Sequence, residues 1–172
     1  MKNNKILLVM MIVGIMSSSL FAQLTDDVDV TATVVAELSL TNPVNVAFGN
    51  VSQDQNAVID PTGASHSGVS NPTIGSLDVT GSSGAAVIVS WNTTVTLADG
   101  DNSATMTFTP NLYQGATSAD AAIVNGTAYN LAAASSDIYI GGTLTVGTTQ
   151  ETGAYSTANT GGTPLTVDIV YQ

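Results

Sequence analysis

The sequence predicts an all-β fold, a two-sheet β-sandwich of the immunoglobulin-like or fimbrial type. Residues 23–172 contain 24 Thr and 17 Val but only two Glu and neither Lys nor Arg, so residues that suit a pleated sheet outnumber good helix formers. Several short segments alternate apolar and polar residues with the period of two that a half-buried strand requires. Turn signals separate these segments at intervals of about ten residues, which favours a sandwich.

The first 22 residues predict a cleaved secretory signal peptide. Lys2 and Lys5 precede the apolar run 6–16 and the small-residue stretch 17–22, and cleavage is expected before Gln23. The apolar run is too short to span a bilayer. We therefore expect an exported chain whose residues 23–172 form a single β-sandwich domain without a membrane span, in the periplasm, at the cell surface or outside the cell.

The first predicted strand is the longest, because an apolar residue occupies every second position from 28 to 40 and only Val35 interrupts the polar face. Further segments with strand character are 44–48, 57–60, 73–80, 85–97, 104–109, 138–146 and 164–171. The expected core residues are Phe48, Leu77, Trp91, Met106, Phe108, Leu144 and Tyr155.

Glycine-containing turns are expected between these strands. Asp99-Gly100 predicts a hairpin loop before strand 104–109, and Asn125-Gly126 predicts a second turn, because these residue types tolerate a positive φ. Segments 61–72 and 115–122 have the composition of loops. We expect Gly49 at a turn or bulge, and positive φ at Gly81 and Gly153.

The side-chain inventory excludes several classes of function. Residues 23–172 hold all 13 carboxylates of the chain and one histidine, His66, and no cysteine. Nucleic acids and anionic lipids are recognised through Lys and Arg, so neither is an expected partner. The absence of Cys excludes a thiol nucleophile and a disulfide framework. No cofactor is predicted.

Catalysis is not expected either. His66 could serve as the base of a triad, but it lies in a Gly/Ser-rich segment without a Gly-x-Ser-x-Gly elbow. The carboxylates are spaced singly, which is typical of solubilising acids and not of a glycosidase pair. The sequence therefore predicts a protein that is not an enzyme.

One weak metal candidate remains. Asp99, Asp101 and Asn102 offer hard oxygen ligands for calcium, but Ala104 and Pro110 occupy positions where an EF-hand needs Gly and Glu. A solvated hairpin tip is the preferred interpretation. A related alternative is a monomeric glycan-binding module, for which Tyr113, Tyr129 and Tyr139 would have to be exposed.

The two ends of the domain suggest partner binding. Leu165, Val167, Ile169 and Tyr171 alternate up to the penultimate residue. Residues 25–34 could lie outside the sandwich and add to the open edge of a neighbour, inserting Val28, Val30, Ala32 and Val34 into its core. The competing interpretation is that 28–40 is one long or bent strand of the same domain.

Several blocks of sequence resemble a secreted bacterial family, the domain of unknown function numbered 4402. They run through almost all of residues 23–172, and they are Ala32–Leu40, Val46–Val51, Leu77–Gly81, Ala85–Val89, Ile140–Gly147, Gly153–Tyr155 and Pro164–Gln172. The resemblance implies an exported β-sandwich similar to fimbrial and spore-coat-U-type subunits, with no catalytic motif. The last strand also resembles the C-terminal recognition strand of chaperone–usher pilins.

These observations predict a structural subunit of the cell surface, fimbria-like or surface-layer-like, that assembles by β-strand addition. Its expected partners are copies of itself or related surface subunits, with a periplasmic chaperone as a possible further partner. The alternative is a monomeric secreted module that binds glycans or calcium.

Overall fold

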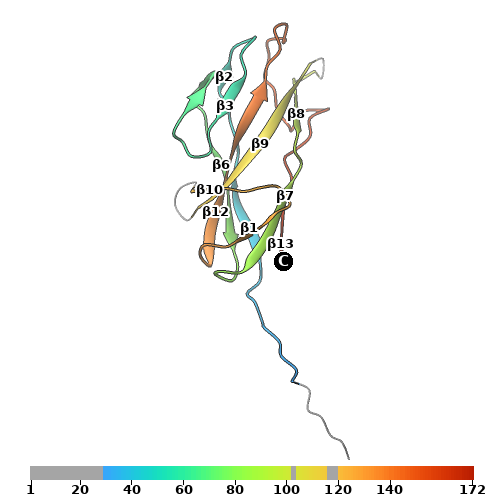
Figure 1. The fold of residues 1–172 in the computed structure, drawn as a ribbon. Helices are drawn as coiled ribbons and strands as arrows, with labels where there is room; N and C mark the ends of the chain where they lie inside the picture. The colour runs from blue at the N-terminus through green and yellow to red at the C-terminus, as the bar shows by residue number, and fades with distance from the viewer. Residues whose placement is uncertain (1–28, 102–103, 116–119) are drawn as a thin grey trace, which may run out of the picture. The chain divides into compact units, whose positions relative to one another are not determined.

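The computed structural model describes residues 29–101, 104–115 and 120–172. The predicted signal peptide and Val28 lie outside these residues. The prediction of an all-β fold is confirmed, because the described part of the chain contains strands and no helix (Figure 1). Residues 34–172 form one compact unit. Residues 29–33 are exposed and belong to no strand.

The strands, in chain order, are β1 (Ser39–Val44), β2 (Asn50–Val51), β3 (Ala57–Ile59), β4 (His66–Ser67), β5 (Val69–Ser70), β6 (Gly75–Thr80), β7 (Ala86–Trp91), β8 (Val95–Ala98), β9 (Thr105–Gly115), β10 (Ala121–Ala122), β11 (Ala128–Asn130), β12 (Ser135–Thr145) and β13 (Val167–Tyr171).

The strands form two main antiparallel sheets. In the larger sheet, β12 pairs with β9 on one side and with β6 and then β3 on the other. β1 and β4 extend it beyond β6 and β3, while β8 and β10 pair with β9. The smaller sheet has the order β11-β7-β13, and β2 and β5 form a separate pair. Figure 1 shows the two long strands, β9 and β12, running side by side through the domain.

A pair of glycines lets β12 change partners. Residues 135–140 pair with β6, whereas residues 142–144 pair with β3. Gly142 has a φ of 139°, and a Cβ there would overlap the carbonyl oxygen of Thr109. It lies opposite Pro110, which has no backbone N–H to donate. β12 nevertheless keeps one continuous register with β9 from Asp137 to Thr145, so only its pairing on the other side changes from β6 to β3.

The core consists of two apolar clusters between the layers of strands. One gathers around Phe48 and Phe108, whose rings meet edge to face at 5.5 Å. The other lies between the two main sheets and includes Val87 and Val89 of β7 facing Leu112 and Ile138. Of the expected core residues, Phe48, Met106, Phe108 and Leu144 are buried, whereas Leu77, Trp91 and Tyr155 are half-buried against these clusters.

The predicted long first strand is wrong over most of its length. β1 begins only at Ser39, and residues 29–38 lie in no strand. Val30 and Val34 are 92% and 95% exposed. The alternation expresses a preference for an extended, half-buried conformation, but a strand also needs a neighbour, and residues 29–38 pair with no strand in the described part of the chain.

The turn predictions are partly confirmed. β8 and β9 form the expected hairpin, and Gly126 has a φ of 71° in the turn from Val124 to Thr127. Gly100 does not have a positive φ. The N–H of Asp99 donates to the carbonyl oxygen of Ala104, so the hairpin loop is longer than the two-residue turn that would require a left-handed residue at Gly100.

The expectations for the other glycines are also only partly confirmed. Gly49 has the expected positive φ of 67°. Gly81 and Gly153 do not, so that expectation is wrong. Gly81 instead permits close packing, since a Cβ there would lie 2.9 Å from the side chains of Leu38, Leu131 and Tyr171.

Two predicted loops contain strands. β4 and β5 lie within 61–72, and β10 lies within 115–122. These strands are two residues long, too short for a periodic signal. β9 also continues past Pro110 to Gly115, where the sequence predicted an end at Thr109. The carbonyl oxygen of Leu112 accepts from Ile123 N–H and so points away from β12; Pro110, two residues earlier, directs its nitrogen to the same side, and the ladder to β12 loses no donor.

Candidate functional site

The strand β13 forms one edge of the smaller sheet. It pairs with β7 from Val167 opposite Trp91 to Tyr171 opposite Val87, and Gln172 N–H donates to the carbonyl oxygen of Ala86. Hydrogen-bonded and non-hydrogen-bonded pairs alternate along an antiparallel ladder. The same register therefore directs the backbone groups of Asp168 and Val170 to β7.

The backbone groups of the alternate residues, Val167 and Ile169, point away from β7. The side chain of Asn125 supports this assignment, because it bonds the N–H and C=O of Trp91 at 3.1 and 2.7 Å. Trp91 thus directs its own backbone away from Val167. In the described part of the chain no strand pairs with this free side of β13.

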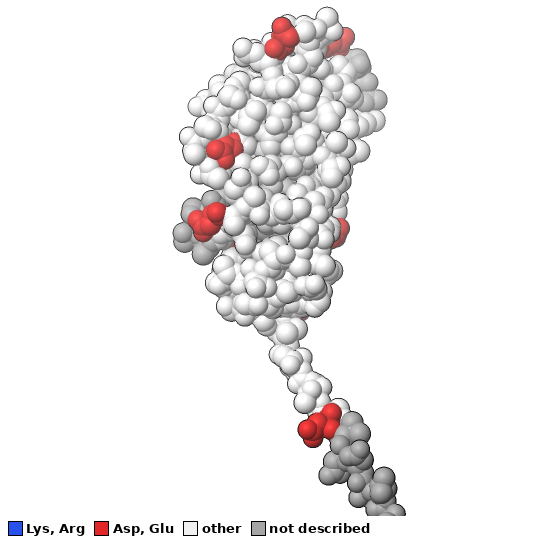
Figure 2. All heavy atoms as spheres, viewed as in Figure 1, with Lys and Arg blue, Asp and Glu red and all other residues white. Residues whose placement is uncertain are grey.

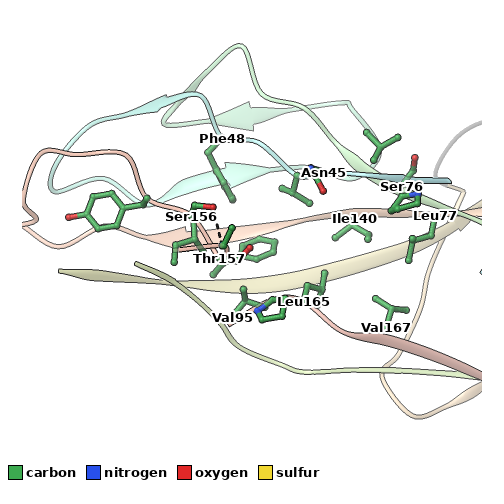
Figure 3. Close-up of a pocket in the computed structure, with 18 of the residues that line it drawn as sticks. Asn45, Phe48, Ser76, Leu77, Val95, Ile140, Ser156, Thr157, Leu165 and Val167 are labelled. Carbon is green, nitrogen blue, oxygen red and sulfur yellow. Dashed lines mark hydrogen bonds between the residues drawn. The ribbon is translucent and has the colours of Figure 1, made fainter. Parts of the chain in front are cut away.

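A groove of about 630 Å³, lined by apolar and uncharged polar residues, lies beside the segment that leads into β13. Figure 3 shows Leu77 and Ile140 on one side of it and Leu165 and Val167 on the other. Val44 at the end of β1 also lines the groove and is 47% exposed. No charged residue is among the lining residues. The groove therefore opens a path from solvent to both core clusters.

A second cavity of about 590 Å³ adjoins the first. The two share Val46, Phe48, Leu97 and Tyr155 as lining residues. Its deeper wall is apolar and its rim is polar: the hydroxyl of Tyr155 accepts a hydrogen bond from Gln150 Nε2 and donates one to the carbonyl oxygen of Glu151, both at 2.8 Å. We name the two cavities together the interlayer groove.

A ring of three hydrogen bonds fixes the chain just before β1. Ala36 N–H donates to Ser82 Oγ at 2.7 Å, and Ser82 N–H donates to the hydroxyl of Tyr171 at 2.9 Å. The Tyr171 hydroxyl in turn donates to the carbonyl oxygen of Ala36 at 2.8 Å. We name these three residues the Tyr171 clamp. The Tyr171 ring packs on the second core cluster while its hydroxyl reaches the sandwich edge.

The structure places the predicted partner-binding residues in two settings. Leu165 and Val167 line the interlayer groove, whereas Ile169 and Tyr171 pack on the second core cluster. Val30, Ala32 and Val34 are exposed, and Val28 lies outside the described residues. Sequence reasoning missed the groove-lining Val44 and the clamp residue Ser82, because neither belongs to a motif and their roles arise only from the pairing of distant segments.

His66 serves a local structural purpose in this arrangement. Its Nδ1 accepts a hydrogen bond from the backbone N–H of Asp60 at 3.1 Å. The Asp60 carboxylate accepts hydrogen bonds from the N–H and hydroxyl of Thr62 at 2.9 and 2.8 Å, and these bonds lower the pKa of Asp60. These contacts stabilise the turn between β3 and β4, and no hydrogen bond joins His66 to a serine hydroxyl among the described contacts.

The calcium candidates are not gathered into a site by the described residues. The Asp99 carboxylate is buried and accepts a hydrogen bond from Ala104 N–H at 3.2 Å, while Asp101 is exposed. Asn102 lies outside the described residues. Within the described ranges no three His, Cys, Asp or Glu side chains are placed to hold a metal ion. Figure 2 shows the acidic side chains scattered singly over the face in view.

The three candidate glycan-stacking tyrosines are half-buried. Tyr113 and Tyr139 face each other across β9 and β12, and the Tyr139 hydroxyl donates to Asp137 at 3.1 Å. Burial and this hydrogen bond raise the pKa of Tyr139. Burial raises the pKa of Tyr129 to about 12, and its buried hydroxyl has no hydrogen-bond partner. None of the three presents the exposed ring that sugar stacking requires.

The fold and the groove together define an all-β domain with an open sheet edge. The chain belongs to the DUF4402 family, a domain of unknown function, which it matches over residues 28–169. No curated protein and no solved structure matches it. In the part of the chain that the structure describes, no helix has the length and apolar character needed to cross a membrane.

Proposed function

We propose that this protein is an exported, non-enzymatic structural subunit of the cell surface, fimbria-like or surface-layer-like, that assembles by β-strand addition at β13. The observation that carries the proposal is the free side of β13 next to an uncharged groove that reaches the core. Export is supported by the predicted signal peptide.

The free side of β13 and the groove beside it both suit an added β-strand as the partner. An unpaired strand edge offers backbone donors and acceptors to an incoming strand. The groove beside it offers apolar surface to every second side chain of that strand, which is how strand addition combines affinity with specificity. A periplasmic chaperone that covers the groove before assembly fits the same chemistry.

The test is the native mass of a chain beginning at Gln23, measured by light scattering together with an unboiled detergent gel. We expect a ladder of oligomers. Val44→Asp, which puts a charge on the wall of the groove, should remove the ladder. The matched control is Val124→Asp, since Val124 is 65% exposed and lines neither cavity. A monomer at all concentrations, or equal loss of assembly in both variants, would overturn the proposal.

The alternative of a monomeric glycan- or calcium-binding module has less support. It would need exposed aromatic rings or converging oxygen ligands, and Tyr113, Tyr129 and Tyr139 are half-buried. Binding screens with glycans and calcium become the next experiment only if the subunit is monomeric.

A further inference from the structure

We propose that the interlayer groove is filled by residues 30–35 of a second copy of this chain, and that the Tyr171 clamp prevents the chain from filling its own groove. This inference rests on the proposed function and adds the identity of the occupant. It also makes the assembly head to tail and open-ended, because the groove and the donor segment are different parts of the chain, so each copy gives one and receives the other.

The first argument is the chemistry of the segment. Val30, Ala32 and Val34 occupy alternate positions, and the two valines are 92% and 95% exposed. Alternate apolar residues of this kind are what an open sheet edge with an apolar groove would bury. They are unusually exposed for an apolar series, so a partner that covers them would remove a substantial apolar surface from water.

The second argument is charge. The segment from Val30 to Ala36 carries no charge and is bounded by Asp29 and Glu37. No charged residue lines the cavity next to β13. Because residues 23–172 contain no Lys or Arg and the one histidine, His66, does not line the groove, a carboxylate of a donor would find no ion pair there. The uncharged stretch is therefore the part of the N-terminal segment that can enter the groove.

The third argument excludes insertion into the same subunit. The clamp holds both backbone groups of Ala36, and Leu38 packs on the second core cluster. A segment returning along its own β1 would have to reverse direction at residues 36–38, which these contacts fix. Residues 30–35 contain no Gly, Pro, Asn, Asp or Ser to supply a turn earlier, and their Val and Thr favour an extended chain.

A mixing experiment tests the inference. The donor-only chain is Val44→Asp, with its N-terminal segment intact, and the acceptor-only chain lacks residues 23–34 but retains nearly all of the compact unit 34–172. Each alone should be monomeric. Their mixture should give a dimer with one copy of each and nothing larger, whereas the chain beginning at Gln23 should give the full ladder.

A peptide experiment keeps the test valid if one of these variants folds poorly. A synthetic peptide of residues 25–35, added to the acceptor-only chain at about 100 times its Kd, should raise the thermal midpoint by about 5–10 °C. The same peptide with Val30→Asp and Val34→Asp should have no effect.

The outcomes separate the two proposals. If the chain beginning at Gln23 never assembles, the proposed function fails. If it assembles and the acceptor-only chain assembles equally well, the proposed function survives and the identity of the occupant is wrong. If the acceptor-only chain is monomeric but binds neither the donor-only chain nor the peptide, head-to-tail exchange is wrong.

Discussion

At the scale of single residues, two tyrosines illustrate how hydrogen bonding decides whether a hydroxyl costs or contributes stability. The Tyr129 hydroxyl is buried without a hydrogen-bond partner, whereas the Tyr171 hydroxyl joins Ala36 to Ser82. A buried polar group without a partner loses its hydration and gains nothing in return. The same substitution should therefore have opposite consequences at the two positions.

We expect Tyr129→Phe to leave the free energy of unfolding unchanged or to raise it by up to about 1 kcal/mol, because it removes an unsatisfied group. Tyr171→Phe should lower it by about 1 kcal/mol, because it removes two hydrogen bonds at the partly exposed sandwich edge, where water replaces part of what is lost. Urea unfolding of the two variants measures both values. Equal destabilisation would contradict the assignment of the clamp.

Tyr129 also predicts how stability changes at high pH. Burial raises the pKa of its phenol from 10.0 to about 12. The folded protein therefore keeps the proton where the unfolded chain has lost it, so this contribution is complete below about pH 10 and declines as the pH rises towards 12. Unfolding curves recorded across this range should show a steeper loss of stability in the unmodified protein than in Tyr129→Phe. Identical slopes would show that Tyr129 ionises as easily in the folded state.

Gly142 shows where a backbone requirement outweighs strand propensity. Its φ of 139° and its contact with Thr109 leave no room for a side chain. Gly142→Ala should cost at least about 2 kcal/mol of stability. Gly100→Ala is the matched control, since a Cβ there meets nothing within 4 Å, and it should change stability by no more than about 0.5 kcal/mol. Chemical denaturation of both variants provides the comparison.

At the scale of elements, β13 should show two classes of backbone amide. The N–H groups of Asp168 and Val170 bond to β7 in the register observed, while those of Val167 and Ile169 point to the free side. Hydrogen exchange resolved by residue should be fast at Val167 and Ile169 in the monomer and slow at Asp168 and Val170. Assembly should slow hydrogen exchange only at Val167 and Ile169. Protection of all four amides in the monomer would mean that the edge is already paired.

The sequence predicted strands best where the alternation of apolar and polar residues within one segment was enough to identify them. Long alternating segments such as 138–146 and 164–171 correspond to β12 and β13, because burial on one face imposes a period of two. The pattern 28–40 has the same signal, yet residues 29–38 lie in no strand. Alternation reports that a segment suits a sheet and does not specify which sheet, so a strand for another subunit looks the same as a strand of its own domain.

The groove could not be predicted for a related reason. It lies between β1 and the segment that enters β13, which are more than 100 residues apart in the chain, and it exists because no segment of residues 34–172 fills the space. No local pattern encodes such a gap. What the sequence did indicate was the pair of alternating ends, Val30 to Val34 and Leu165 to Tyr171, which supply the exposed segment and the open edge.

At the scale of the whole molecule, charge would oppose the proposed assembly while apolar burial would drive it. The chain contains 13 acids and two lysines, and both lysines, Lys2 and Lys5, precede Gln23, so residues 23–172 carry a net charge of −13. Two copies therefore repel each other on approach, and no cation in residues 23–172 could compensate. The groove itself is uncharged beside β13, so the repulsion acts on the approach and not on the final contact.

Salt should consequently accelerate assembly of the chain beginning at Gln23. Raising the ionic strength from about 0.01 to 0.15 M shortens the screening length from about 30 to about 8 Å, which removes most of the repulsion between separated surfaces. We expect the association rate, followed by light scattering, to rise at least several-fold, while the chain lacking residues 23–34 stays monomeric at every salt concentration. Interfaces held by complementary charges slow down as salt increases. A rate that falls with salt would therefore show that assembly depends on attraction between charges, and it would contradict an uncharged strand entering the uncharged cavity beside β13.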